Sequence, residues 1–432
     1  QILMTFLRKW KPEGYRYIIC LLIFLSYVLV YFHRLCPAVI ALDMQEAFVV
    51  SGTLMGVLGS AYFYPYAIMQ LPIGLLADSW GPRKTVSVFF LLAASGSVLM
   101  GMAPNLAMAI LGRVLVGLGV STVFVCNFKL LAEWFSSKQF VIMGGIFMAM
   151  GGVGALFSSA PLAWVSNLIG WRMTLVGVGV TTLVMALLVY AFVRNRPSEA
   201  GFPSNGVAPA GVPERKRSLV GGVKLVVSSG RFWPIAVWTF FSIGIAFALG
   251  GLWGGPYLIQ VHGLSKTAAG GVLSMFAVAL MVGSPFLSWI ANRVGRKPVL
   301  TGCSLLLIAV CGIFYSFTDR LTLSVLYLLF FFFSLAGAAT GPVVAAVSKE
   351  LFPVAIAGTS VGTVNLFPFL GGALFQVVVG AILTRSGHNG GGYSVAGYQD
   401  MFLIYLLGAI ISLLAAAFLK ETLSRIEPSE DG

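Results

Sequence analysis

Long apolar runs constrain this chain most strongly, because stretches of eighteen or more apolar residues recur along its full length. A helical run of that length matches the thickness of the hydrocarbon core of a membrane. The alternating segments of about ten residues that are typical of outer-membrane barrels do not occur. Only 9% of the residues are charged, whereas about a quarter are charged in soluble globular proteins. We therefore predict an all-α membrane protein.

The apolar runs divide into twelve predicted transmembrane helices. In the first half they are Tyr17–Ala41, Thr53–Ala77, Thr85–Met102, Leu106–Trp134, Gln139–Trp164 and Met173–Phe192. In the second half they are Phe232–Val261, Thr267–Ile290, Val299–Thr318, Leu321–Leu351, Ala357–Thr384 and Tyr398–Leu419. We predict two bundles of six helices, 1–193 and 231–432, joined by a polar linker, 194–230.

The distribution of basic residues predicts the orientation in the membrane. With both termini and the linker inside, the cytoplasmic segments hold 20 of the 27 lysines and arginines, and the outer loops hold four. This bias follows the positive-inside rule. The linker includes a basic cluster, Arg215-Lys216-Arg217, and the segment Leu219–Val227 is a candidate for lying on the membrane surface. The net charge of +13 therefore indicates membrane orientation, and we expect no nucleic-acid partner.

No cofactor or metal site is predicted. The five cysteines lie inside apolar runs without paired spacing, which favours packing over disulfides or metal ligation. No phosphate-binding loop, zinc-protease motif or nucleophile elbow stands out, so we expect neither an ATP-driven pump nor an enzyme.

The two halves share a repeated loop. Asp78-Ser79-Trp80-Gly81-Pro82-Arg83-Lys84 joins the second and third predicted helices, and Asn292-Arg293-Val294-Gly295-Arg296-Lys297 joins the eighth and ninth. Asp78 and Asn292 are 214 residues apart, as are Gly81 and Gly295. This constant offset indicates duplication of a six-helix unit.

These loops, together with Arg113-x-x-x-Gly117-x-Gly119 in the fourth helix, resemble the major facilitator superfamily over essentially the whole chain. The resemblance implies two six-helix bundles that alternate access to a site near the midplane. Within that superfamily the chain resembles the organic anion:cation symporters and organophosphate antiporters. The resemblance lies at Arg34, Tyr62, Tyr66, Gln70-Leu71-Pro72 and Gly170-Trp171-Arg172. The basic residue that organophosphate antiporters carry in the seventh helix is missing here.

Two arginines inside predicted helices are the leading substrate-binding candidates. Arg34 has no carboxylate in its own helix to neutralise it, and a buried cation normally faces a cavity or a partner. Arg113 is predicted at a similar depth, and two guanidinium groups suit a carboxylate or a phosphate. The alternative for Arg113 is a structural role, in which it holds backbone carbonyls and packs against glycines.

Hydroxyl and amide side chains on the same helix faces are further candidates for orienting a substrate, although aromatic stripes more often serve packing. These candidates are Tyr31, Tyr62, Tyr66, Gln70, Asn127, Asn365 and Gln376. His33 is a candidate for proton coupling, with buried packing as the alternative. No Asp or Glu lies deep in a predicted helix, so a carboxylate proton carrier at the midplane is not expected.

A third group of residues is predicted to act in gating. Asp78 is expected to hold the outward-open state through a helix N-terminus of the other half and nearby Arg83. The helical phase turns Lys129 away from Arg113, which favours a gate or interface role. The complete set is Asp78, Gly81, Arg83, Lys129, Trp253, Tyr257 and Asn292.

The sequence thus predicts a secondary active transporter of a small organic anion, either a carboxylate or a phosphorylated metabolite, with proton-linked movement. The alternatives are an exporter of neutral or hydrophobic compounds and a membrane sensor that has lost transport. We expect a monomer among membrane lipids, in a bacterial inner membrane.

Overall fold

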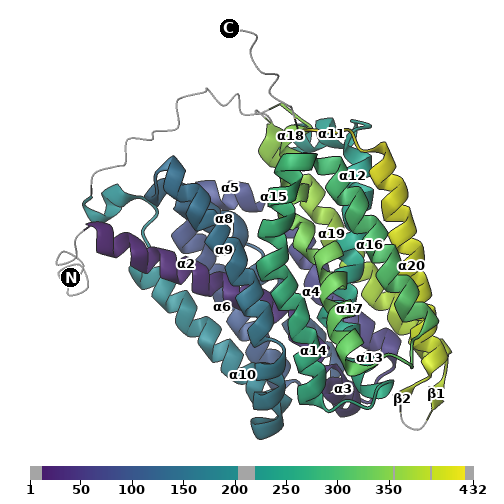
Figure 1. The fold of residues 1–432 in the computed structure, drawn as a ribbon. Coiled ribbons are helices and arrows are strands. Elements are labelled where there is room, and N and C mark those ends of the chain that lie inside the picture. Colours follow the sequence, from purple (N-terminus) through teal and green to yellow (C-terminus); the bar gives the residue numbers. More distant parts are fainter. Residues whose placement is uncertain (1–11, 203–218, 354–355, 390–391, 424–432) are drawn as a thin grey trace.

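The computed structural model describes residues 12–202, 219–353, 356–389 and 392–423. Figure 1 shows two helical bundles side by side, one formed by early residues and the other by late residues. The first contains α2 (Pro12–Leu35), α3 (Pro37–Phe48), α4 (Gly52–Met69), α5 (Ile73–Ser79), α6 (Pro82–Met102), α7 (Leu106–Val120), α8 (Val123–Trp134), α9 (Ser137–Phe157) and α10 (Ala160–Phe192). A short 3-10 helix, η1 (Pro197–Ala200), follows.

The second bundle begins after α11 (Leu219–Val227), a helix that packs against α12 and α19. The basic cluster Arg215-Lys216-Arg217 lies outside the described residues. The elements are α12 (Phe232–Ala248), η2 (Leu249–Trp253), α13 (Gly254–Gln260), α14 (Lys266–Val278), η3 (Ala279–Gly283), α15 (Ser284–Val294), α16 (Arg296–Ser316), α17 (Leu323–Ala336), η4 (Ala338–Thr340), α18 (Gly341–Glu350), α19 (Ala357–Arg385) and α20 (Val395–Phe418). A small antiparallel hairpin, β1 (His388–Asn389) and β2 (Gly392–Tyr393), precedes α20.

The number of membrane crossings follows from where helices are interrupted. Ten described helical stretches are long and apolar enough to cross a membrane. One of them, Ile142–Phe192, has 51 residues, and Gly170 divides it at a φ of 78°. The broken helix α4–α5 supplies a further crossing. The twelve predicted helices and the predicted fold class are therefore confirmed.

Prolines explain two breaks that the predicted boundaries missed. The first crossing was predicted to end at Ala41, but helical residues continue to Phe48. Within it, α2 ends at Leu35 because Pro37 has no backbone N–H to donate, and α3 begins at that proline. The second crossing breaks at Gln70-Leu71-Pro72 for the same reason. A break in a membrane helix frees backbone carbonyls, which then need other donors.

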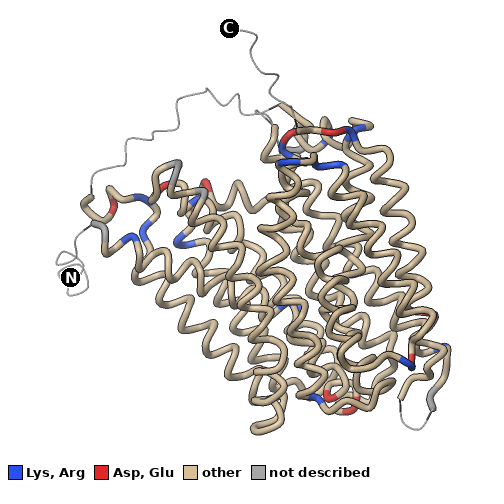
Figure 2. Tube along the Cα trace, viewed as in Figure 1, with Lys and Arg blue, Asp and Glu red and all other residues tan. Residues whose placement is uncertain are grey.

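Charged residues lie mainly at the two ends of the bundles (Figure 2). We call the end that carries α11, the start of α2 and the end of α20 the linker face. The opposite end, which carries α3 and the β1–β2 hairpin, is the far face (Figure 1).

The repeated loops build matching structures at the linker face. The N–H of Arg83, at the start of α6, donates to the side chain of Asn195, 2.9 Å away and just beyond the end of α10. The N–H groups of Arg296 and Lys297, at the start of α16, donate to Glu421, just beyond the end of α20. Partial burial alone would raise the pKa of Glu421, but its four backbone N–H donors hold that pKa below its ordinary value.

Contacts between the bundles close the far face. Lys266 pairs with Asp43 at 2.7 Å, and Thr384 accepts a hydrogen bond from the N–H of Thr53 at 3.0 Å. We call these two pairs, together with Gln45–Tyr393, the far-face seal; the amide of Gln45 donates to the Tyr393 hydroxyl at 2.5 Å. Tyr393 belongs to the β1–β2 hairpin, so the hairpin helps to hold the bundles together.

At the far face, a glycine lets the backbones of the two bundles come into contact. A Cβ built on Gly255 of α13 would overlap the carbonyl oxygen of Ala38 in α3. The backbones of the two bundles therefore touch at a position where only glycine fits.

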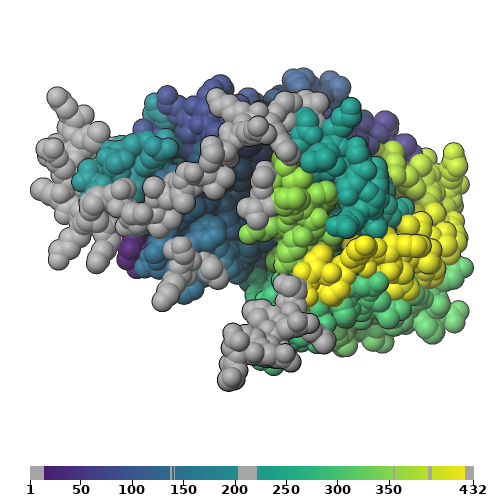
Figure 3. Space-filling model, turned by 90° about the horizontal axis from the view of Figure 1, so that it is seen from above, coloured from purple at the N-terminus to yellow at the C-terminus, as the bar shows by residue number. Residues whose placement is uncertain are grey.

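The bundles separate toward the linker face. Asn365 donates a hydrogen bond to Gln70 at 2.8 Å. Among the described residues, this is the hydrogen bond between the bundles that lies nearest to the linker face. Figure 3, which looks onto the linker face, shows a recess between the early and late parts of the chain. The structure is therefore closed at the far face and open toward the linker face.

Candidate substrate site

Arg34 lies in the last turn of α2, directly before the break at Pro37. Its side chain is buried, with 3% of the residue exposed. Its Nε donates a long hydrogen bond, 3.4 Å, to the hydroxyl of Tyr62. No carboxylate pairs with it in the part of the chain that the structure describes. Since a buried cation is costly without a partner, the site lacks an anion.

Four aromatic rings surround the guanidinium group, and we call them the aromatic cage. The Cζ of Arg34 lies 4.6 Å from the ring centre of Tyr31, 5.1 Å from Tyr66, 5.3 Å from Phe247 and 5.1 Å from Phe369. The tyrosines belong to the first bundle and the phenylalanines to the second. Each such contact contributes about 0.5–2 kcal/mol, so the cage compensates part of the cost of burying the charge. Arg34 is therefore held where the two bundles meet.

Arg113 of α7 holds the broken end of α2. One terminal nitrogen donates to the carbonyl of His33 at 2.6 Å, and the other donates to the carbonyl of Arg34 at 3.3 Å. The group also lies over the ring of Tyr62, 4.7 Å from its centre. These are backbone contacts of the kind that the sequence left open as the alternative for Arg113. Each terminal nitrogen uses one of its two N–H groups in these bonds, whereas the buried Nε has no hydrogen-bond partner among the described residues. These contacts tie Arg113 to the backbone that carries Arg34.

The glycines that follow Arg113 let α7 approach its neighbours. A Cβ on Gly117 would meet the backbone carbonyl of Tyr62 in α4, and one on Gly119 would meet the backbone of Ala93 in α6. The spacing of Arg113, Gly117 and Gly119 thus combines a hydrogen-bonding residue with two close contacts. Tyr62 is fixed between Arg113 and Arg34 as a result.

Three of the predicted polar candidates make contacts within the fold. Asn365 and Gln70 bond to each other across the bundles. The amide of Asn127 donates to the carbonyl of Ile23 at 3.1 Å, which ties α8 to α2.

Gln376 occupies the narrow junction of α4, α19 and η2. A Cβ on Gly59 would meet its side-chain oxygen, and this buried oxygen has no hydrogen-bond partner among the described residues. Its backbone carbonyl accepts from the Trp253 indole at 3.0 Å.

His33 faces α10, on a different side of α2 from the cage. Its Nε2 lies 2.9 Å from the hydroxyl of Thr182, and that hydroxyl donates to the carbonyl of Val178. The hydroxyl therefore accepts from His33, which fixes the proton on Nε2. The structure does not bring His33 into contact with Arg34's guanidinium.

The linker-face candidates form contacts within their own bundles. Asp78 pairs with Lys129 at 2.5 Å. Arg83 donates instead to the carbonyl of Tyr190 at 2.8 Å, after a turn in which Gly81 has a φ of 78°. Asn292 accepts from Arg296 at 2.6 Å. A contact between Asp78 and the other bundle belongs to the opposite state of the protein, and it stays a prediction.

Trp253 and Tyr257 are buried in the second bundle next to an irregular segment. Residues Leu249–Trp253 form a π-helical turn, η2, that contacts α2, α3 and α4. The Tyr257 hydroxyl donates to the carbonyl of Thr318 at 2.7 Å. Such turns are frequent at functional sites, and this one lies where the far face closes.

Sequence reasoning missed Phe247 and Phe369, the second bundle's part of the cage. They are two of 33 phenylalanines, in helices that are apolar all round. No periodic or polar signal distinguishes them. Thr182, the partner of His33, was missed for the same reason.

Comparison with known proteins agrees with this architecture. The model of the Major Facilitator Superfamily matches residues 19–376 and 255–431. The chain is 24% identical to the D-galactonate transporter of Escherichia coli O6:H1, over 95% of this chain and 97% of that protein. It is also 24% identical to a probable galactarate/D-glucarate transporter of Escherichia coli K12, over 89% and 92% of the two chains.

Solved structures show the same fold at low sequence identity. A bacterial homologue of the lysosomal transporter Spinster, in an inward-facing and occupied conformation, superposes with a TM-score of 0.73 at 19% identity, over 95% of this chain and 96% of that one. A D-xylose-proton symporter superposes with a TM-score of 0.71 at 18% identity, over 94% and 99%. The family match over most of the chain, the two six-helix bundles and the repeated loops lead to one conclusion: this protein belongs to the Major Facilitator Superfamily of membrane transporters.

Proposed function

We propose that this transporter moves a small organic anion and that Arg34 binds its carboxylate. The observation that carries the proposal is the buried guanidinium of Arg34, which lies between the bundles with no carboxylate partner among the described residues. A carboxylate can accept two parallel hydrogen bonds from such a group. The relatives named above are transporters of sugar acids, which carry carboxylates.

The charge available at the site favours an anion with a single negative charge. Arg113 lies close by, but each of its terminal nitrogens already donates one hydrogen bond to a backbone carbonyl of α2. In the described part of the second bundle, the buried basic residue is Arg296, which lies at the linker face and pairs with Glu350. Of Arg34 and Arg113, Arg34 is the one that bonds to no backbone carbonyl among the described residues, while Arg113 is committed in part to α2, so we favour a monocarboxylate over a phosphorylated metabolite.

We also propose that transport is linked to protons. No Asp or Glu is buried in the described part of the chain, so a proton has two carriers close to the site: His33 and the carboxylate of the substrate itself. Binding of the substrate at Arg34 joins the two bundles, because the cage takes rings from both. Movement of the bundles about this point would then expose the site to either side.

Reconstituted vesicles test this function. Protein in vesicles that contain a pH-sensitive dye is expected to acidify the interior when D-galactonate or benzoate is added outside. The part of the uptake and of the pH change that exceeds the passive entry measured in protein-free vesicles should disappear in Arg34→Ala. Uptake without a pH change would contradict proton linkage, and uptake of neither compound by an intact, folded protein would contradict the choice of substrate.

The orientation is part of the proposal, with the linker face in the cytoplasm. It is supported by the excess of basic residues at that face. A cysteine in place of exposed Ser198 is expected to resist an impermeant thiol reagent added to intact cells. A cysteine in place of exposed Arg320, at the other end, should react within the same time. The reverse labelling pattern would show the opposite topology.

A further inference from the structure

We infer that the anion carried by this transporter has a flat, apolar body, such as an aryl carboxylate, and is not a polyhydroxylated sugar acid. The inference rests on the proposed binding of a carboxylate at Arg34 and names the class of its substrate. It comes from the chemistry of the side chains that the second bundle presents to Arg34. These are the rings of Phe247 and Phe369.

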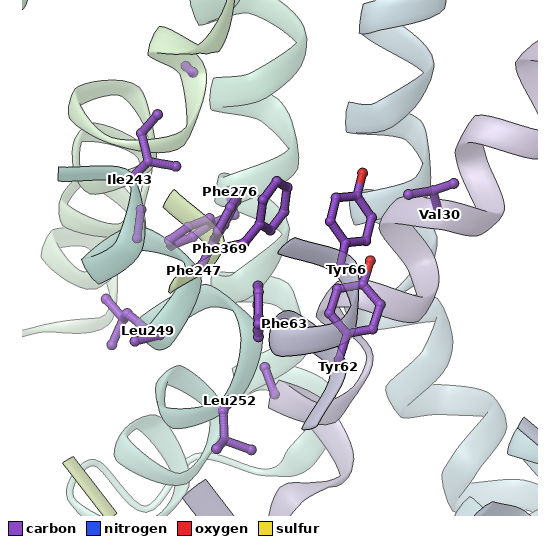
Figure 4. Close-up of a cluster of buried hydrophobic side chains, with 14 of the residues drawn as sticks. Val30, Tyr62, Phe63, Tyr66, Ile243, Phe247, Leu249, Leu252, Phe276 and Phe369 are labelled. Carbon is purple, nitrogen blue, oxygen red and sulfur yellow. The ribbon is translucent and has the colours of Figure 1, made fainter. Parts of the chain in front are cut away.

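The rings around Arg34 form a stack that runs across both bundles. Phe63 and Phe247 lie with ring centres 5.8 Å apart and planes 29° apart. Phe247 and Phe369 follow at 5.5 Å and 25°, and Phe369 and Tyr66 at 4.2 Å and 38°. Figure 4 shows these rings gathered between the two bundles. Ring centres at such distances are typical of packed aromatic pairs, so the side chains that the second bundle brings to Arg34 are flat and apolar.

The polar groups on the two tyrosines lie on one side of the stack. In Figure 4 the hydroxyls of Tyr62 and Tyr66 point the same way, upward in the view, and Val30 of α2 lies beside them. Arg34 comes from that helix, α2, and its Nε bonds to the Tyr62 hydroxyl. A carboxylate that binds Arg34 therefore has its polar partners on the side of the first bundle, and its body extends along the phenylalanines.

A sugar acid would need a polar partner for each hydroxyl group that leaves water. The amides nearest to the cage do not supply them in this structure. Gln70 and Asn365 bond to each other at 2.8 Å. The amide of Gln376 lies 3.5 Å from the carbonyl oxygen of Phe247, and its side-chain oxygen has no partner among the described residues. This single acceptor could serve one hydroxyl group, but not the several hydroxyl groups of a sugar acid. Hydroxyls placed against Phe247 and Phe369 would lose their hydrogen bonds to water without replacement.

Competition binding on the purified, intact protein tests the inference. The probes are benzoate, cyclohexanecarboxylate and D-galactonate, each with one carboxylate. Benzoate is expected to bind at least about tenfold more tightly than D-galactonate, with cyclohexanecarboxylate between them because it is apolar but not flat. All binding should require Arg34.

Phe369→Leu isolates the contribution of one ring, because leucine keeps the site apolar. Benzoate affinity is expected to fall about three- to tenfold more than D-galactonate affinity, because any change in the position of Arg34 affects both anions alike. The matched control is Phe367→Leu on the same helix, since Phe367 packs against Phe232 and Trp233 away from Arg34. This control should leave both affinities unchanged.

The outcomes separate the two proposals. Tighter binding of D-galactonate than of benzoate, dependent on Arg34, would overturn the inference and leave the proposed function standing. Equal binding of benzoate and cyclohexanecarboxylate would overturn the requirement for a flat body. Binding that does not depend on Arg34 would overturn the proposed function itself.

Discussion

Replacing Arg34 with alanine is expected to abolish recognition of the anion and, with it, transport. The guanidinium is buried, has no carboxylate partner in the described part of the chain, and contacts rings from both bundles. A hydrogen bond to a charged group is worth about 1.5–3 kcal/mol, so affinity should fall about tenfold to a hundredfold or more. Calorimetric titration of the purified protein with benzoate and with D-galactonate measures the loss.

Arg34→Lys is expected to fail as well, because an ammonium group cannot reproduce the planar fork that holds a carboxylate with two hydrogen bonds. The control is Arg320→Ala, which makes the same chemical change at an exposed position of the far face. It should bind and transport normally. Full binding by Arg34→Ala would show that the arginine serves only the packing of the cage.

Gly255→Ala is expected to prevent closure of the far face and to stop transport. The added Cβ would occupy the place of the Ala38 carbonyl oxygen, which belongs to the backbone of the other bundle and cannot rotate away. Overpacking of a tight contact costs about 1–3 kcal/mol, which shifts a two-state equilibrium roughly 5- to 150-fold. The protein should therefore populate the state that is open at the far face.

A cysteine at Thr53, inside the far-face seal, reports on this shift. Both proteins are made without the five native cysteines. The cysteine at position 53 should react slowly with an impermeant thiol reagent in the parent protein and much faster in the protein that also carries Gly255→Ala. Gly312→Ala is the control, because a Cβ there would meet no atom within 4 Å. Unchanged reactivity in Gly255→Ala would mean that α3 and α13 can move apart without opening the face.

The crossings were predictable from the sequence because each must present about twenty apolar residues to lipid. The fourth, predicted as Leu106–Trp134, coincides with the observed stretch. The first was less accurate, since hydropathy does not register the break that Pro37 introduces or the helical continuation to Phe48. That break matters, because it creates the carbonyls that Arg113 holds.

The candidate site was predictable only in part. An arginine in an apolar helix stands out in any sequence, so Arg34 and Arg113 were both identified. Whether the N–H groups of these arginines are engaged depends on contacts between α2 and α7. Arg34 and Arg113 are 79 residues apart in the sequence, so these contacts cannot be read from it. The phenylalanines of the cage carry no signal of their own, because their role comes from facing a charge on a different bundle.

The caps at the start of α6 and α16 have a consequence for the transport cycle. Asn195 covers the first N–H of one helix and Glu421 those of the other, and each cap comes from the same bundle as the helix it serves. If the bundles move as rigid units, as we propose, these backbone groups keep their partners. In the rocking motion that we propose, these backbone N–H groups would not have to be dehydrated and rehydrated in each cycle, and the free energy of the motion would depend on the side chains that face the other bundle.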